Sequence, residues 1–244
     1  MSEVHLDAEL QVARRVMDQL LPHELPAIRG FETAAINLPS RDVGGDYYEF
    51  IPLAEDRWGI ATADAVGKGI AAALLVAATR ASLCSLVGLE LAQRAIMRRM
   101  NAFFYHSTEE GKFVTLFYLV LDLRTRRLIY VNAGHVPPVL VRSSGAVELL
   151  EEGGLPLGLF EDARYVEGFA SIAPGDVLAL FTDGITEAMD KGDQLYGRDR
   201  LIESLRRWQS ASASDICREC MREVEAFGRG QVADDQSLVI LKAI

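Results

Sequence analysis

With 244 residues, half of them hydrophobic, the chain is long enough to form one large domain with a substantial core. Acidic residues outnumber basic ones by 35 to 25, and the net charge of −10 argues against a nucleic-acid-binding surface and suits a divalent cation. Three cysteines, an odd number without regular spacing, argue against a disulfide framework and indicate a reducing, cytoplasmic environment.

The first predicted element is an N-terminal helix that ends before Pro22. Its apolar positions are separated by steps of three and four residues, and they are Leu6, Leu10, Ala13, Met17 and Leu20. Two heptads are too few to establish a coiled coil, so this helix either packs on its own domain or pairs with a partner helix. We therefore divide the chain into a linker or regulatory helix over residues 1–24 and a domain over residues 25–244.

Three short strands are predicted next, over residues 33–38, 47–53 and 57–64. The first two are separated by a turn over residues 39–45, and the last two are joined by a short acidic turn. Because consecutive strands with short connections usually pair, we expect an antiparallel meander.

A pair of helices follows the third strand. The apolar run that starts at Ile70 has no helix breaker before Gly88, which predicts a buried helix. Its most apolar part is interrupted at Arg80 and is too short to cross a bilayer of ~30 Å, and no signal peptide is recognised, so we expect no membrane association. The periodicity of residues 89–105 predicts a second helix, packed antiparallel to the first.

The second half of the chain contains a hairpin, a buried strand, two helices and a final strand. The hairpin is predicted over residues 112–133 and the buried strand within residues 174–184, which it enters through a Pro-Gly turn. The helices cover 198–208 and 212–227, and the last strand covers 236–241. Strands that outnumber the helices, with the helices in pairs, indicate an α+β fold and not a doubly wound parallel sheet.

Four places share one pattern, in which an aspartate lies at the end of an apolar strand beside glycine or another aspartate. These residues are Asp46, Asp64, Asp183 and the pair Asp234 and Asp235. Any one of them could equally be a turn former or a helix cap. Together they would repel one another and raise their own pKa values unless a metal neutralised them, and hard oxygen ligands favour Mg²⁺ or Mn²⁺.

Other chemistries lack the residues that they need. A nucleotide-binding P-loop would require a glycine where Thr62 stands and a serine or threonine where Gly69 stands. Cys217 and Cys220 lie inside a predicted helix and are interpreted as buried packing residues. His135, in a proline-rich turn, is interpreted as a residue that organises its loop.

Several motifs in a fixed order carry a family resemblance. They include VGGDYYEF, DAVGKGIAAALL, YVNAGHVPPVL, PGDVLALFTDGITEA and DDQSLVIL. The chain resembles the metal-dependent serine/threonine protein phosphatases of the PPM superfamily, and specifically the bacterial branch of sporulation stage II protein E and RsbU, from about Ala8 onward. The resemblance implies a β-sandwich of two mainly antiparallel sheets flanked by paired helices, with two Mn²⁺ or Mg²⁺ ions in an acidic cleft.

The resemblance also implies a set of catalytic, metal-binding residues. Asp64 would bridge the two ions, Ala65 would offer its carbonyl oxygen, and the remaining ligands would be Asp46, Asp183 and Asp234. Lys68 departs from the branch, where histidine is frequent at this place, but this change removes no carboxylate.

The function implied by the resemblance is hydrolysis of phosphoserine or phosphothreonine in a protein. The expected substrate is a phosphorylated anti-sigma-factor antagonist in a partner-switching or stress-response pathway, and an upstream sensory domain would control the enzyme. The alternative is a non-catalytic scaffold that retains the fold and binds the phosphoprotein without turnover.

Two further expectations concern substrate binding and assembly. Arg41 lies in the turn that precedes Asp46, where its guanidinium would bind a phosphoryl oxygen, although a solvated turn arginine is the simpler interpretation. The apolar face of the N-terminal helix predicts a homodimer.

Overall fold

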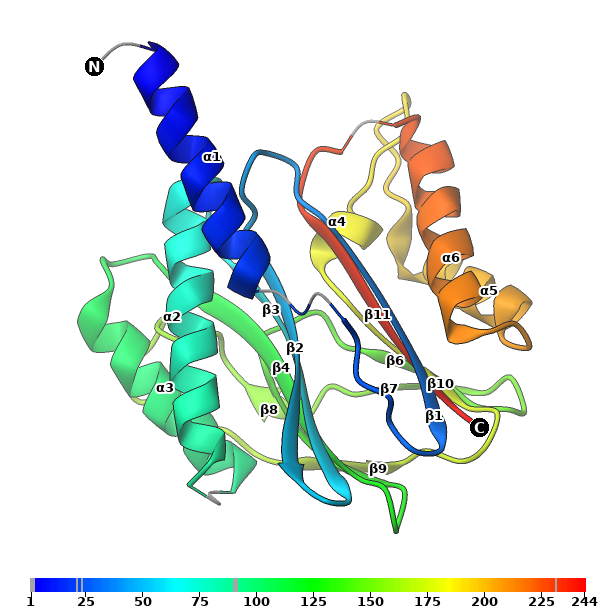
Figure 1. The fold of residues 1–244 in the computed structure, drawn as a ribbon. Coiled ribbons are helices and arrows are strands. Elements are labelled where there is room, and N and C mark those ends of the chain that lie inside the picture. The colour runs from blue at the N-terminus through cyan, green and yellow to red at the C-terminus, as the bar shows by residue number, and fades with distance from the viewer. Residues whose placement is uncertain (1–2, 21, 23, 90–91, 231) are drawn as a thin grey trace.

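The computed structural model describes residues 3–20, 22, 24–89, 92–230 and 232–244, without the side chains of residues 3–9 and 18. Two β-sheets face each other in the middle, and helices cover both outer faces (Figure 1). The predicted α+β class, with two mainly antiparallel sheets flanked by paired helices, is therefore confirmed.

The first sheet has the strand order β1-β11-β10-β6-β7. Its strands are β1 (Phe31–Leu38), β11 (Gln236–Ala243), β10 (Val177–Phe181), β6 (Val139–Val141) and β7 (Val147–Leu149). All pairs in this sheet are antiparallel, and the last strand of the chain lies between β1 and β10.

The second sheet has the strand order β2-β3-β4-β5-β8, and β9 also pairs with β5. Its strands are β2 (Asp46–Ala54), β3 (Arg57–Ala65), β4 (Val114–Asp122), β5 (Arg127–Ala133), β8 (Gly153–Gly154) and β9 (Gly168–Ser171). The predicted hairpin over residues 112–133 is confirmed as β4 and β5.

The predicted meander of the first three strands is wrong in one respect. β2 and β3 pair as expected, but β1 pairs with β11 in the other sheet. The segment over residues 39–45 therefore crosses from one sheet to the other. Its local sequence resembles a hairpin turn, and the pairing of β1 with a strand 200 residues later could not be read from it.

Two helix pairs cover the sheets. α2 (Ile70–Val87) and α3 (Gln93–Ser107) lie on the second sheet, while α5 (Gly197–Trp208) and α6 (Ala213–Gly228) lie on the first (Figure 1). α1 (Glu3–Leu20) lies along α2, and α4 (Asp183–Thr186) is a single turn after β10. The predicted capping box of α6 is present, because the Ser212 hydroxyl accepts a hydrogen bond from the Asp215 amide.

Alternation along the strands divides the core into three layers. On β11, Leu238 and Ile240 pack toward α5 and α6, whereas Val239 and Leu241 pack between the two sheets. On β4, Leu116 and Tyr118 pack toward α2 and α3 in the same manner. Both sheets are thus buried on both faces.

The prediction that α2 is a buried helix is only partly correct. Its face toward the second sheet is buried, but Leu74 is 66% exposed and Ile70 is 44% exposed. By length and composition alone, α2 is also the one described helix that could span a membrane. That evidence is weak, because a helix packed on a soluble core passes the same test.

Candidate metal centre

The strand register brings the predicted aspartates to one end of the sandwich. Asp46 begins β2 and lies directly opposite Asp64 near the end of β3. Asp183 follows β10, and Asp234 precedes β11, the antiparallel neighbour of β10. Each sheet therefore supplies two of the four carboxylates that the sequence predicts.

Asp46 lies at the junction of the two sheets and is 4% exposed. Its Oδ2 atom accepts hydrogen bonds from Thr182 Oγ1 at 2.6 Å and from Ser237 Oγ at 2.7 Å, both on the opposite sheet. Burial raises the pKa of Asp46 well above its ordinary value, and these two hydroxyls partly oppose the shift. The neighbouring carboxylates of Asp64 and Asp235 raise the pKa further.

The pKa of Asp64 is raised by more neighbouring carboxylates than that of Asp46 or Asp183. Burial, the largest cause, and the neighbouring carboxylates together raise its pKa to about 7. Four other carboxylates add to the shift, those of Asp183, Asp234, Asp235 and Glu187. Their mutual repulsion is what the sequence predicts for converging acids that lack a neutralising cation. Glu187, in the motif after Asp183, is a member of this cluster that the sequence analysis did not single out.

Asp183 is subject to the same repulsion from two sides. Burial raises its pKa, and Glu187 and Asp234 raise it further. The positive charge of Lys68 opposes this rise in the pKa of Asp183. The Lys68 ammonium group also lies 3.1 Å from Asp234 Oδ1 and donates a hydrogen bond of 2.7 Å to the carbonyl of Ala233. Lys68 therefore fastens the turn before α2 to the segment that carries Asp234.

Two glycines allow the ligand-bearing segments to approach one another. A Cβ atom on Gly45 would lie 2.9 Å from the carbonyl oxygen of Ala65 and 3.6 Å from Asp64 Oδ1. A Cβ atom on Gly184 would lie 2.0 Å from the carbonyl oxygen of Asp235. Larger residues at either position would push apart the backbone segments that hold the carboxylates.

Asp235 is a structural residue and not a fifth open ligand. It is 5% exposed, and its carboxylate accepts hydrogen bonds from the Ser40 amide at 2.6 Å, the Ser40 hydroxyl at 2.8 Å and the Gly45 amide at 2.5 Å. Asp235 thereby fixes the crossing segment over residues 39–45 beside Asp46. The sequence placed it beside Asp234 but gave no sign of this role.

Arg41 is exposed on the same crossing segment. Within the described part of the chain, its side chain makes neither a hydrogen bond nor an ion pair. Its proximity to the acidic cluster stays a prediction. Asp42 of this segment lines a cavity of about 550 Å³ that extends from Arg14 and Met17 of α1 to Asp46.

The donor chemistry of the cluster suits a hard divalent cation. The predicted ligands are all oxygen atoms, and several carry raised pKa values that a cation would lower. Among the described residues, however, no group of three or more His, Cys, Asp or Glu side chains forms a ready-made ion site. The acids lie near one another in an open arrangement, in which Asp234 faces Lys68, and their role as metal ligands stays a prediction.

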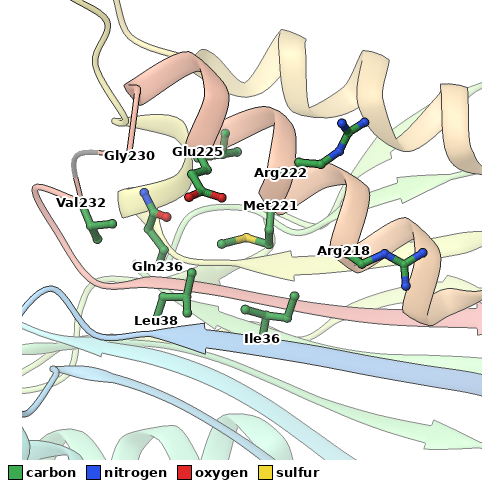
Figure 2. Close-up of a pocket in the computed structure, with 10 residues that line it drawn as sticks. Ile36, Leu38, Arg218, Met221, Arg222, Glu225, Gly230, Val232 and Gln236 are labelled. Carbon is green, nitrogen blue, oxygen red and sulfur yellow. The ribbon is translucent and has the colours of Figure 1, made fainter.

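A separate apolar cavity lies between α6 and the adjoining ends of β1 and β11. It has a volume of about 500 Å³, and Figure 2 shows Met221 of α6 facing Ile36 and Leu38 of β1. Gln236 lines it too and donates a hydrogen bond of 3.0 Å to the Gly184 carbonyl. None of the predicted ligands lines this cavity, so it is distinct from the acidic site.

The predictions for the other reactive side chains are in accord with the structure. Cys217 and Cys220 are free thiols buried under α6, and burial raises both of their pKa values. His135 is buried in the turn between β5 and β6. Its place in this turn agrees with the predicted role of loop organiser, whereas the sequence gives no sign of its contact with Thr115, whose hydroxyl donates to the Asp64 carbonyl.

Comparison with known proteins identifies a family. The profile of the family described as Stage II sporulation protein E (SpoIIE) matches residues 54–244. The phosphoserine phosphatase RsbU of Bacillus subtilis is 28% identical over 240 residues, covering 97% of this chain and 70% of that protein. Protein IcfG of Synechocystis sp. is 30% identical over 224 residues, covering 81% of this chain but only 35% of that protein.

Solved structures show the same fold at low sequence identity. The SiaA-PP2C domain of Pseudomonas aeruginosa superimposes with a TM-score of 0.88 at 18% identity, with each chain fully covered. The catalytic domain of the serine/threonine protein phosphatase PstP, solved in complex with two manganese ions, gives a TM-score of 0.65 at 18% identity over 88% of this chain and 98% of that one.

Proposed function

Because the chain belongs to the stage II sporulation protein E family, we propose that it is a metal-dependent phosphatase that acts on phosphoserine and phosphothreonine in a protein substrate. The observation that carries the proposal is the convergence of Asp46, Asp64 and Asp183, whose pKa values are all raised. Such a cluster is stable with its charges only when cations share the site.

The proposed ligands are those that the sequence predicts. Asp64 would hold both of two ions, and the carbonyl of Ala65 and the remaining carboxylates, Asp46, Asp183 and Asp234, would complete the set. Bound Mn²⁺ or Mg²⁺ supplies an activated water at neutral pH and positive charge beside the phosphoryl oxygens. The fold of a relative with two manganese ions supports the number two.

The protein's own groups orient these ligands. Thr182 and Ser237 hold one oxygen of Asp46, which leaves its other oxygen available. Asp235 fixes the crossing segment, and Gly45 leaves space in front of the Ala65 carbonyl. A protein accelerates phosphoryl hydrolysis mainly by binding and orienting the reacting groups with side chains that are already in place.

The substrate and the biological setting are proposed from the named relatives. RsbU is named a phosphoserine phosphatase, and a phosphorylated anti-sigma-factor antagonist in a partner-switching pathway is the proposed substrate. The match covers only 35% of IcfG. From the family resemblance, we propose that an upstream sensory domain controls the phosphatase. We propose a cytoplasmic location for the phosphatase.

Release of inorganic phosphate tests the activity. The assay compares a phosphoserine peptide and phosphorylated antagonist proteins, each with Mn²⁺, Mg²⁺ or EDTA, using the wild type and Asp64→Asn. We expect turnover that depends on the metal and is lost in the variant. Tight binding of a phosphoprotein without any turnover would instead support the scaffold alternative.

Arg41 is the proposed contact for a phosphoryl oxygen. If its guanidinium binds the substrate, Arg41→Ala should lower kcat/KM for a phosphoserine peptide by about tenfold, as expected for loss of a charge-assisted hydrogen bond of ~1.5 kcal/mol. Arg124→Ala, an exposed arginine in the turn between β4 and β5, is the matched control. Equal kcat/KM values for the two variants would reduce Arg41 to a surface residue.

A further inference from the structure

His135 is linked through Thr115 to the backbone of Asp64, the residue that is proposed to bridge the metal ions. Its Nδ1 atom is 2.9 Å from Thr115 Oγ1, and the Thr115 hydroxyl is 3.3 Å from the backbone carbonyl oxygen of Asp64. Thr115 on β4 is also the register partner of Asp64 on β3. A single hydroxyl is therefore shared between a buried imidazole and the backbone of Asp64.

The turn that carries His135 is built to hold the ring in one place. The Asn132 side chain makes two hydrogen bonds across the turn. It accepts one of 2.7 Å from the His135 amide and donates one of 2.9 Å to the His135 carbonyl. Gly134 has a φ of +70°, and a Cβ atom there would lie 2.4 Å from Pro156. These contacts explain why asparagine and glycine stand shortly before His135 in the YVNAGHVPPVL motif.

The imidazole also lies between the two sheets. Burial lowers the pKa of His135 to about 4, and the nearby Phe181 carbonyl only partly opposes this shift. Its Nε2 atom has no hydrogen bond of ordinary geometry within the described residues. Phe181 ends β10, two residues before Asp183, so the neutral ring lies between Thr115 of β4 and the end of β10 that precedes Asp183.

We propose that His135 and Thr115 are positioning residues for the metal centre. The enclosed imidazole orients the Thr115 hydroxyl, and this hydroxyl holds the backbone of Asp64 in place. The Asp64 carboxylate is thereby kept in the position in which it would bind both ions. The proposal rests on the metal centre of the proposed function but adds residues that touch neither metal nor substrate. Removal of such outer partners typically weakens metal binding by about 10–100-fold.

Calorimetric titration with Mn²⁺ at pH 7 tests the relay without any substrate. Thr115→Val removes the hydroxyl at nearly constant shape, and Thr115→Ser keeps it. Thr79→Val is the matched control, because the Thr79 hydroxyl also donates a hydrogen bond to a backbone carbonyl, that of Leu75 within α2. We expect a Kd for Mn²⁺ about tenfold or more weaker in Thr115→Val, and values close to the wild type in the other two.

Thermal unfolding in EDTA separates positioning from simple destabilisation. Thr115→Val and Thr79→Val should each lose Tm, because each loses a hydroxyl bonded to a backbone carbonyl, while only the former should lose Mn²⁺ affinity. Unchanged affinity in Thr115→Val would overturn the relay and leave the proposed phosphatase intact. A wild type that binds no Mn²⁺ would overturn both.

Discussion

Asp64 combines burial with repulsion from like charges. Since its pKa rises from an ordinary 3.8 to about 7, the folded metal-free protein is stabilised below pH 4 by this group, and the contribution is lost as the pH rises to 7. Asp64→Asn removes the charge. In EDTA, the variant should therefore gain Tm relative to the wild type at pH 8, by on the order of 5 °C, and gain little at pH 4.5.

Differential scanning fluorimetry of both proteins at several pH values measures this difference. Its growth with pH is the diagnostic feature, because a simple change in packing would shift Tm equally at every pH. A Tm difference between variant and wild type that stays constant from pH 4.5 to 8 would show that ionisation of Asp64 does not destabilise the metal-free protein.

His135 has the opposite pH dependence. Its pKa is lowered from 6.5 to about 4, so the stability that its neutral form provides is complete above pH 6.5 and is lost as the pH falls toward 4. His135→Gln cannot take up that proton. The fall in Tm between pH 7 and 4.5 in EDTA should be smaller in the variant than in the wild type, and parallel curves would contradict the assignment.

The sequence alone predicts the aspartates of the site better than it predicts the residues that form hydrogen bonds with them. The four aspartates are visible because each ends an apolar strand in a glycine-rich or acidic motif. Thr182, Ser237 and Thr115 are not, since each contact depends on strand pairing or on the approach of two sheets. The direction of the Asp234 side chain toward Lys68 likewise requires coordinates.

At the scale of elements, the crossing segment over residues 39–45 depends on Asp235 from the far end of the chain. Asp235→Asn keeps the shape but replaces one acceptor oxygen by a donor, so the hydrogen bonds to Ser40 and Gly45 cannot all persist. We expect a loss of about 1–3 kcal/mol in the free energy of unfolding and faster trypsin cleavage after Arg41.

Limited proteolysis at 25 °C followed by mass spectrometry checks this prediction. Asp162→Asn, the same substitution at an exposed position, serves as the control. Cleavage after Arg41 at the same rate in both variants would mean that the segment is held by other contacts.

The elements themselves differ in how far their sequences define them. The β4 and β5 hairpin and the capped helix α6 follow from local patterns, and both are present. The predicted meander fails at β1, because its partner β11 is remote in sequence. α2 reads as fully buried because it is apolar all round, yet Leu74 is exposed on the side away from the sheet.

At the scale of the whole molecule, the apolar surface around α1 bears on assembly. Met17 packs against the core beneath α2, but Val12 and Val16 are 49% and 51% exposed, and Leu74 of α2 is 66% exposed. Such a surface favours a homodimer formed through α1. Leu10, on the apolar face of α1 that the sequence predicts, is half-buried, and Leu10→Glu should shift the protein to a monomer and change its phosphatase activity.

Light scattering at several concentrations, paired with phosphatase assays, tests the dimer. Gln11→Glu is the matched control, because it adds the same charge at a neighbouring exposed position. A wild type that is monomeric throughout, or a Leu10→Glu monomer with unchanged turnover, would remove the proposed link between assembly and activity.

The central claim is that aspartates from two sheets form one metal centre, and anomalous diffraction from crystals grown with Mn²⁺ tests it most directly. The account predicts two anomalous peaks about 3.5–4 Å apart. The Asp64 carboxylate should lie beside both peaks, with those of Asp46, Asp183 and Asp234 each beside one of them. Well-diffracting crystals with no peak in this cleft, or with Mn²⁺ held by other residues, would contradict the account.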